Sequence, residues 1–121
     1  MNPFNEIKLR LRDFAADRDW DQFHSPKNLS MALIVEAGEL VELFQWLKQD
    51  ESLALSADKL KEVEQEIADI QIYLVRLADK LGIDIEKAVE EKIAVNAQKY
   101  PADEVRGSAS LDDFSGCDDG C

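Results

Sequence analysis

The stretch SADKLKEVEQEIADIQIYLVRLADKLG, residues 56–82, decides the fold. Its apolar residues recur every three or four positions, a spacing that is typical of a helix and not of a strand. The stripe on one side of this helix consists of Leu60, Val63, Ile67, Ile70, Leu74, Leu77 and Leu81. Ser56 or Asp58 is suited to cap the beginning, and Gly82 is suited to end it as the C′ residue. We therefore predict one long helix between them.

Three other segments show the same spacing, and each begins with a capping residue or a first-turn proline. They run from Asn2–Pro3 to near Arg18, from Ser25–Pro26 to Lys48–Glu51, and from Asp84 to just before Pro101. Residues 20–24 form a connector. No stretch alternates strictly between apolar and polar residues, so strands are not expected. The sequence predicts an all-α protein, a bundle of four helices.

The long helix carries apolar residues on more than one face. Ile72 and Val75 lie opposite the main stripe, and a single small bundle rarely covers both sides of a helix. We therefore expect a homo-oligomer, most simply a dimer with an interface built from helices of both chains.

Length and composition indicate one domain. The chain has 121 residues, of which 45% are hydrophobic, enough for a core. We expect residues 1–100 to form the domain and the acidic, glycine- and serine-rich residues 101–121 to be a disordered tail. Cys117 and Cys121 lie in that tail, so no disulfide framework is expected.

The charge restricts the partners. With 14 Lys and Arg against 26 Asp and Glu, the net charge is −12, which argues against binding polymeric nucleic acid. A small anionic ligand remains compatible, because divalent cations can reverse the local sign. Neither a signal peptide nor a membrane span is recognisable, so we expect a cytoplasmic protein that does not bind membranes.

Two carboxylate pairs carry the chemistry. Glu36 and Glu39 form E-x-x-E, and Glu66 and Asp69 form E-x-x-D; this spacing places both members of each pair on one helix face. Both pairs border an apolar stripe, where an unpaired charge is costly. Four oxygen ligands without histidine or thiolate favour Mg²⁺, or Mn²⁺ as a substitute, over zinc. The pattern suggests metal-assisted hydrolysis of a phosphate ester or anhydride.

Alternatives remain at this point. Each motif alone is common on solvated helix surfaces, and a non-catalytic helical scaffold dimer would carry the same charges. A di-iron bundle fits poorly, because it needs Glu-x-x-His pairs and the single histidine, His24, lies outside the helices.

Further candidates lie on the last helix and among the aromatic residues. Lys92 and Asn96 share its inward arc, with Tyr100 just beyond. Lys92 is equally suited to meet phosphate oxygens or to form a structural salt bridge. Trp20, Trp46 and Tyr73 can stack on a nucleobase, although core packing explains any one of them.

The carboxylate pairs and four longer strings resemble the MazG-type all-α nucleoside triphosphate pyrophosphohydrolases, in particular their dCTP pyrophosphatase branch. The strings are RDWDQFHSPKNL (residues 18–29), EAGELVELFQW (36–46), IADIQIYLVRLA (67–78) and NAQKYP (96–101). The resemblance implies Mg²⁺-dependent hydrolysis of dCTP and modified dCTP to dCMP and pyrophosphate, a housecleaning of the nucleotide pool, by tetramers built from dimers.

The resemblance also implies roles for residues. Glu36, Glu39, Glu66 and Asp69 would bind Mg²⁺, and Lys92, Asn96 and Tyr100 would contact the triphosphate. Trp20, Trp46 and Tyr73 would line the base and sugar pocket. For the mechanism itself, our own hypothesis is that Glu39 takes the proton of the attacking water and that Lys92 stabilises the leaving pyrophosphate. Leu11 stands where mammalian members carry a base-pocket histidine, which leaves a broader (d)NTP specificity open.

Overall fold

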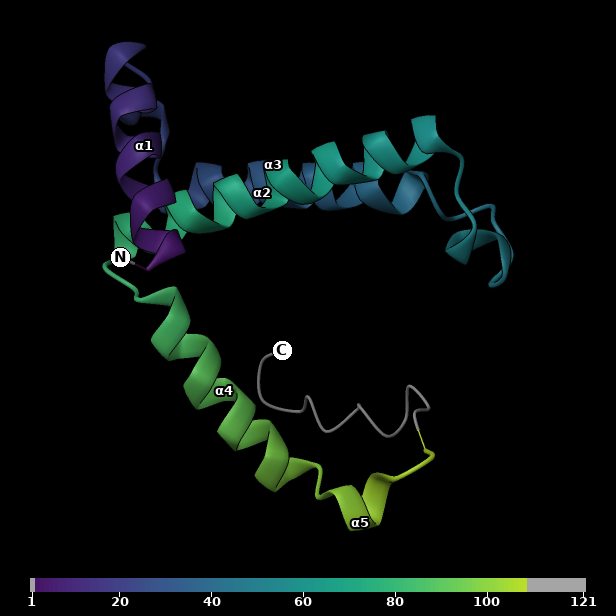
Figure 1. The fold of residues 1–121 in the computed structure, drawn as a ribbon. Coiled ribbons are helices and arrows are strands. Elements are labelled where there is room, and N and C mark those ends of the chain that lie inside the picture. The colour runs from purple at the N-terminus through teal and green to yellow at the C-terminus, as the bar shows by residue number, and fades with distance from the viewer. Residues whose placement is uncertain (1, 109–121) are drawn as a thin grey trace. The chain divides into compact units, whose positions relative to one another are not determined.

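The computed structural model describes residues 2–108, which are helical wherever they are regular. The helices are α1 (Pro3–Asp17), α2 (Pro26–Glu42), α3 (Ala57–Leu81), α4 (Ile85–Lys99) and α5 (Ala102–Val105), with 3₁₀ turns η1 (Asp21–Phe23) and η2 (Glu51–Leu53) (Figure 1). The expected all-α class is confirmed. The chain divides into two compact units between Ile85 and Glu86, and each is described by itself.

The helix starts follow the predicted capping residues. The side chains of Asn2, Ser25 and Ser56 accept hydrogen bonds from first-turn backbone N–H groups, which the helix leaves without partners. Ser56, rather than Asp58, is therefore the cap of α3. At its other end Gly82 adopts φ 68°, a left-handed conformation that glycine adopts without a steric penalty.

Helix α2 ends earlier than the sequence predicted. We expected it to fade at Lys48–Glu51, but its last residue is Glu42. The N–H groups of Leu43 and Phe44 bond to carbonyls three residues back, at 3.2 and 3.0 Å, and such tight turns close the helix. The apolar spacing continues beyond this point, which explains why the pattern overstated the length.

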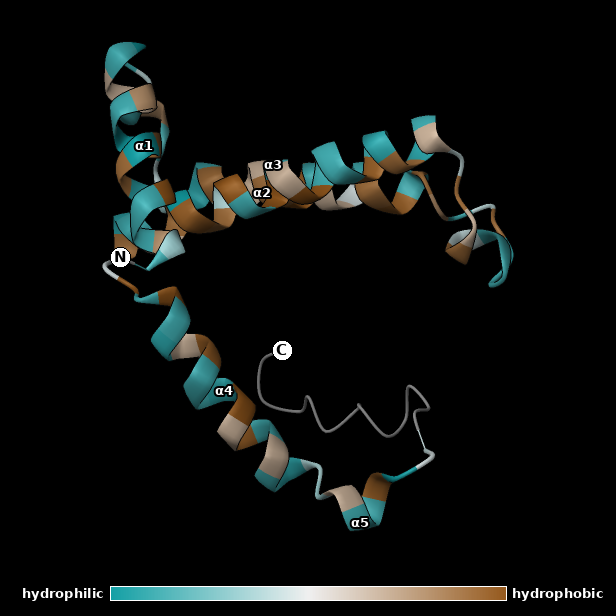
Figure 2. Cartoon of the chain, viewed as in Figure 1, coloured by the Kyte–Doolittle hydropathy of each residue, from teal (hydrophilic) through white to brown (hydrophobic). Residues whose placement is uncertain are grey.

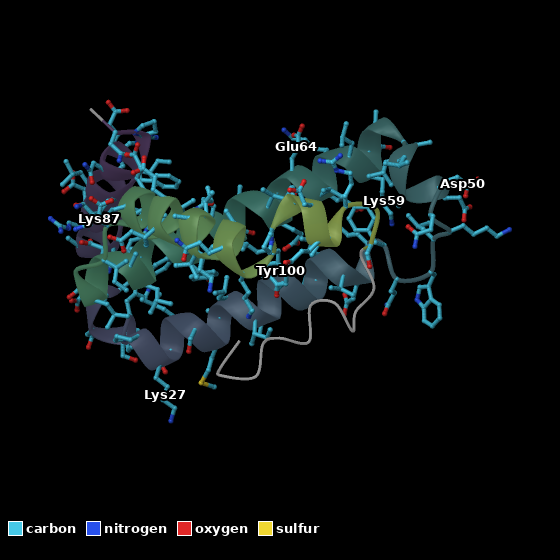
Figure 3. The ribbon with its side chains drawn as sticks, turned by 90° about the horizontal axis from the view of Figure 1, so that it is seen from below. Lys27, Asp50, Lys59, Glu64, Lys87 and Tyr100 are labelled. Atoms are coloured by element: carbon cyan, nitrogen blue, oxygen red, sulfur yellow. The ribbon has the colours of Figure 1, made fainter. Side chains whose placement is uncertain are left out.

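The first unit is built on α2 and α3, which lie side by side and antiparallel (Figure 1). Leu29 of α2 and Val75 of α3 are almost fully buried. Helix α1 packs on the C-terminal half of α3, where Ala15 is buried and Arg12 forms a two-point ion pair with Asp79. Lys27 and Glu64 point outward from the α2–α3 pair (Figure 3).

Apolar residues recur along α2 and α3 (Figure 2), and many of their side chains are exposed in the single chain. The predicted stripe of α3 is a case in point, because Leu60, Ile67 and Leu81 are 50–55% exposed, whereas Val75 from the opposite side is buried. On α2 the exposed residues are Met31, Ile34, Val35 and Val41. The expectation that α3 is apolar on more than one face is therefore confirmed, and both sides contribute to the packing, because Val63 of the predicted stripe is buried as well as Val75.

The second unit contains α4 and α5. Helix α4 has nearly the predicted bounds, whereas α5 lies in the segment expected to be disordered. Cys117 and Cys121 fall outside the described residues, and the division at residue 100 stays a prediction. In residues 2–108 we find no helix with the length and apolarity needed to span a membrane.

Candidate functional site

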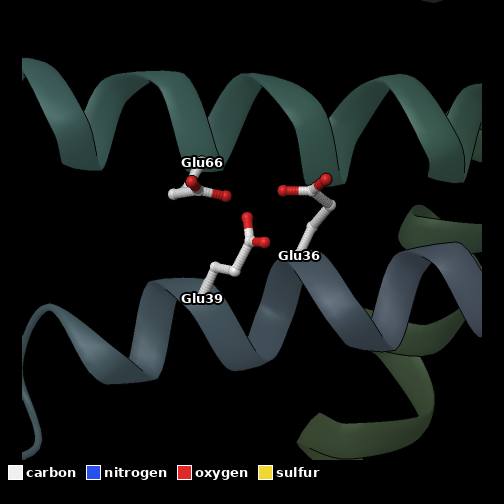
Figure 4. Close-up of side chains that lie close together, drawn as sticks. All are labelled: Glu36, Glu39 and Glu66. Atoms are coloured by element: carbon white, nitrogen blue, oxygen red, sulfur yellow. The ribbon is translucent and has the colours of Figure 1, made fainter.

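Three carboxylates meet between α2 and α3. Glu36 and Glu39 project from α2 toward Glu66 of α3 (Figure 4). Each offers an oxygen, and these oxygens all lie within 4.8 Å of one another. The i, i+3 spacing on α2 puts its two carboxylates on the face that packs against α3. We call these three residues the carboxylate cluster.

The carboxylate cluster holds negative charge without compensation. The Oε2 atoms of Glu36 and Glu66 are buried and have no hydrogen-bond partner within residues 2–108. The pKa of Glu36 is raised to about 7, first because a proton on it is shared with Glu66, then because of burial, and then because of Glu39. Buried oxygens without partners and close like charges both favour the arrival of a cation.

The donor set defines what the carboxylate cluster can hold. Among the described residues it consists only of carboxylate oxygens, with no histidine or cysteine in the group. Such hard ligands suit a divalent cation that prefers oxygen. The residues therefore fit a divalent metal centre.

Asp69, the fourth predicted ligand, is not in this group. It lies one helical turn beyond Glu66 on α3, where it lines an adjacent pocket. The structure thus brings together three of the four predicted ligands, and the role of Asp69 stays a prediction.

That pocket lies against α1, the connector and α3 and has a volume of about 370 Å³. Its lining includes Leu11, Phe14, Trp20, His24, Asp69, Ile72, Tyr73 and Arg76. Trp20 packs edge to face on Phe14, with ring centroids 5.8 Å apart. The pKa of Tyr73 is raised by burial and then by Glu36 and Asp69, so its hydroxyl stays protonated. We call this cavity the aromatic pocket.

Not every predicted site residue lies here. Trp46 follows the end of α2 and is 87% exposed. Lys92, Asn96 and Tyr100 belong to the second unit, and their expected contacts with a triphosphate stay predictions. Of the predicted aromatic residues, the structure therefore brings Trp20 and Tyr73 together.

Sequence reasoning missed a polar network beside the aromatic pocket. Arg76 is only 4% exposed and donates to His24 and to Asp21, and Lys80 pairs with the same Asp21. The available signal was an arginine inside the apolar run IYLVRLA, residues 72–78. A charge at such a position is buried only with partners.

The helical fold and the paired carboxylates define the class of protein. The chain belongs to the MazG-like family, whose family model matches residues 31–110. Similar proteins include dCTP pyrophosphatase 1 from Rattus norvegicus, 48% identical over 107 residues, and its human counterpart, 43% identical over 106 residues.

Each alignment covers 86% of this chain and 62% of the relative, so the chain spans less than two thirds of their length. A solved structure of a pyrophosphatase from Archaeoglobus fulgidus is also similar. It has a TM-score of 0.78 and 39% identity, and the match covers 84% of this chain and 94% of that one.

Proposed function

We propose that the chain is a Mg²⁺-dependent nucleoside triphosphate pyrophosphohydrolase that converts dCTP and modified dCTP to the monophosphate and pyrophosphate. The single observation that carries the proposal is the carboxylate cluster, whose buried oxygens lack partners. The names of the relatives, dCTP pyrophosphatase 1 and a pyrophosphatase, supply the reaction and the substrate. The activity is a housecleaning of the nucleotide pool, and the expected cytoplasmic location stays a prediction.

The cluster residues divide the work according to their burial. Glu36 and Glu66, the less exposed members, hold the cation together with Glu39, and Asp69 is a further ligand. Mg²⁺ supplies a Lewis acid that neutralises phosphate charge and makes water more acidic. We assign to Glu39, the exposed member of the cluster, the further role of accepting the proton of the water that attacks the α-phosphorus.

Residues outside the cluster bind the rest of the nucleotide. Lys92 stabilises the leaving pyrophosphate, with Asn96 and Tyr100 as further triphosphate contacts. Trp20 and Tyr73 hold the base and sugar in the aromatic pocket, and Trp46 completes this lining. Trp46 is exposed in the single chain, and in an oligomer it can reach the aromatic pocket of a neighbouring chain.

A homo-oligomer, a dimer or a tetramer built from dimers, is part of the proposal. Large apolar side chains on α2 and α3 are more than half exposed, among them Ile34, Val35 and Ile67. Exposed apolar patches of this kind are typical of subunit interfaces. Sedimentation analysis tests this point, and a monomer at micromolar concentration would contradict it.

Broad specificity for (d)NTPs is the second candidate. It is favoured by Leu11 in the lining of the aromatic pocket, because an aliphatic side chain offers a base contact but no hydrogen bond. A non-catalytic scaffold dimer is the remaining alternative, and it predicts no response to nucleotide.

Product analysis tests the proposal. The purified protein is incubated with each of the four dNTPs and four NTPs, with Mg²⁺ or with EDTA. Release of dCMP and pyrophosphate mainly from dCTP, abolished by EDTA, is expected. Turnover of several nucleotides would replace the dCTP assignment by broad specificity, and no turnover of any would contradict the enzyme.

The matched variants are Glu39→Gln and Glu42→Gln. Both remove one charge from α2, but Glu42 is exposed and lies outside the carboxylate cluster. Hydrolysis should be lost only in Glu39→Gln, with helical content unchanged in both. Equal activity of the two variants would contradict the role of Glu39.

A further inference from the structure

The connector, residues 20–24, places Trp20 in the wall of the aromatic pocket. Directly before it, Asp19 has a φ of 54°, a left-handed conformation that is costly for residues other than glycine. The N–H of Trp20 then bonds to the carbonyl of Ala15 at 2.9 Å. A sharp turn of this kind persists only where the surrounding structure holds it. The position of Trp20 therefore depends on contacts that hold the connector.

Two cations of α3 hold the connector through Asp21. One Nη of Arg76 donates to Oδ1 of Asp21 at 3.0 Å, and Nζ of Lys80 donates to the same oxygen. The two cations are four positions apart, so they share one face of α3. The pKa of Asp21 is lowered, first by the hydrogen bond from Lys80 and then by the one from Arg76. We call Asp21, Arg76 and Lys80 the connector clamp.

The two cations of the connector clamp differ in burial and in their further partners. The side chain of Arg76 is 5% exposed and also contacts His24 and Asp79. The side chain of Lys80 is 25% exposed, and among the described residues its one ion pair is with Asp21. Loss of Arg76 therefore disturbs the interior as well, whereas loss of Lys80 changes mainly the clamp. Lys80 is the member that tests the clamp in a folded protein.

Asp21 and Lys80 lie outside the aromatic pocket. Its described lining includes Trp20 and Arg76, but neither Asp21 nor Lys80. Asp21 follows Trp20 directly in the chain, so opening of the clamp displaces the indole ring. The ring packs edge to face on Phe14, and Trp20 remains 45% exposed. Packing alone therefore leaves this wall of the pocket weakly fixed, and the clamp supplies the remaining hold.

We propose that Asp21 and Lys80 are positioning residues for the nucleotide, because with Arg76 they hold the connector in the conformation that forms the pocket wall. A base then meets a preformed wall, and binding does not have to order the connector. With a weakened clamp, only the molecules with the connector in place bind tightly, which reduces the apparent affinity. The chemistry at the carboxylate cluster stays the same. The inference rests on the proposed function, since it concerns the same nucleotide.

The first test needs no nucleotide. The N–H groups of Phe23 and His24 bond to carbonyls within the connector, at 2.9 and 3.1 Å, and their exchange with solvent requires the connector to open. Amide hydrogen exchange of residues 20–24 should be about threefold faster in Lys80→Met than in the wild type. An unchanged exchange rate would overturn the connector clamp.

The matched control is Lys61→Met. Lys61 is also a lysine of α3 in an ion pair, with Glu64 at 3.2 Å, but both side chains are exposed and neither belongs to the connector. Connector exchange should equal the wild-type rate in this variant. Equal acceleration in Lys61→Met and Lys80→Met would show a general loosening of α3 and would overturn the specific role of Lys80.

A double-mutant cycle tests the clamp from the other side. Asp21→Asn removes the shared carboxylate charge from the connector and should also speed the exchange. Adding Lys80→Met to it should have clearly less effect than in the wild type, because the partner charge is already gone. Full additivity of the two changes would overturn their action as one clamp.

Steady-state kinetics test the link to the nucleotide. Lys80→Met should raise KM for dCTP about threefold and leave kcat unchanged. Lys80→Arg keeps the cation and should restore the wild-type KM, and Lys61→Met should equal the wild type. A fall in kcat at unchanged KM, or a KM that does not change, would overturn the positioning role.

Inorganic triphosphate separates positioning from a direct effect of charge. It carries the phosphates without a base, so its inhibition constant should be the same in Lys80→Met and in the wild type. An increase parallel to that of KM would mean that Lys80 attracts the phosphates, and would overturn the proposal. If the wild-type protein hydrolyses no nucleotide, the proposed function fails and the positioning role fails with it, while hydrogen exchange still decides whether the clamp holds the connector.

Discussion

Helix α3 takes part in two groups of charged residues that are arranged in opposite ways. The unmatched group is the carboxylate cluster, and the matched group is Arg76 with Asp21 and Asp79. Near its middle, Glu66 faces two other carboxylates and no cation among the described residues. Nearer its C-terminus, Arg76 and Asp79 are buried and matched with opposite charges from the connector and α1. The matched charges stabilise the fold, whereas the unmatched ones weaken it, and binding of the proposed cation would relieve their repulsion. The uncompensated charge of the carboxylate cluster thus supports the proposed metal site.

The largest expected effect concerns the unmatched group. Glu36→Gln keeps the shape of the side chain but removes a cation ligand, so hydrolysis should fall by about 10²–10³-fold. The same change removes like-charge repulsion, and the metal-free variant should therefore unfold at a higher temperature than the wild type. Calorimetry and product assays check both. A variant that loses activity and stability together would contradict the comparison.

The matched group should respond in the opposite way. Arg76→Met leaves Asp21 and the largely buried Asp79 with fewer partners, and we expect a loss of about 3 kcal/mol in the free energy of unfolding. Arg12→Met, whose side chain is half exposed, should lose clearly less. Urea unfolding of both variants measures the difference, and equal losses would contradict the importance of burial.

The two groups should also differ in their dependence on pH. The pKa of Glu36 is raised from 4.5 to about 7, so the folded state binds more protons than the unfolded state between these values. The metal-free protein should therefore lose stability as pH rises through this range. At saturating Mg²⁺, stability should instead rise with pH above about 4.5, because the cation binds the ionised carboxylate.

At lower pH the matched group dominates. The pKa values of Asp21 and Asp79 are lowered from 3.8, by hydrogen bonds from Lys80 and Arg12 respectively. Their contribution to stability is present above that value and is lost as pH falls below it. Unfolding curves across the acid range, with Arg12→Met as the comparison, check the assignment.

The sequence predicted the local features well. The caps Ser25 and Ser56 and the terminal Gly82 act through neighbours within a few residues, so spacing alone identifies them. The end of α2 was missed because apolar spacing runs on past Glu42 into tight turns. Local signals therefore predicted where the helices begin, but they did not predict where α2 ends.

The candidate site was predictable only where spacing decides it. Glu36 and Glu39 share a helix face by periodicity, and Glu66 was placed beside them because its motif also borders an apolar stripe. The bond between Arg76 and His24 joins residues 52 positions apart, and the pattern contains no information on such a pair.

The most direct test of the central claim is a calorimetric titration of the metal-free protein with Mg²⁺ and Mn²⁺ at about pH 7, in buffers that differ in ionisation enthalpy. The account predicts saturable binding with release of a fraction of a proton, because Glu36 is partly protonated there. Glu36→Gln should bind more weakly and release no proton, whereas Glu42→Gln should match the wild type. No saturable binding of either ion, or equal proton release in Glu36→Gln, would contradict the claim that the carboxylate cluster is a divalent metal centre.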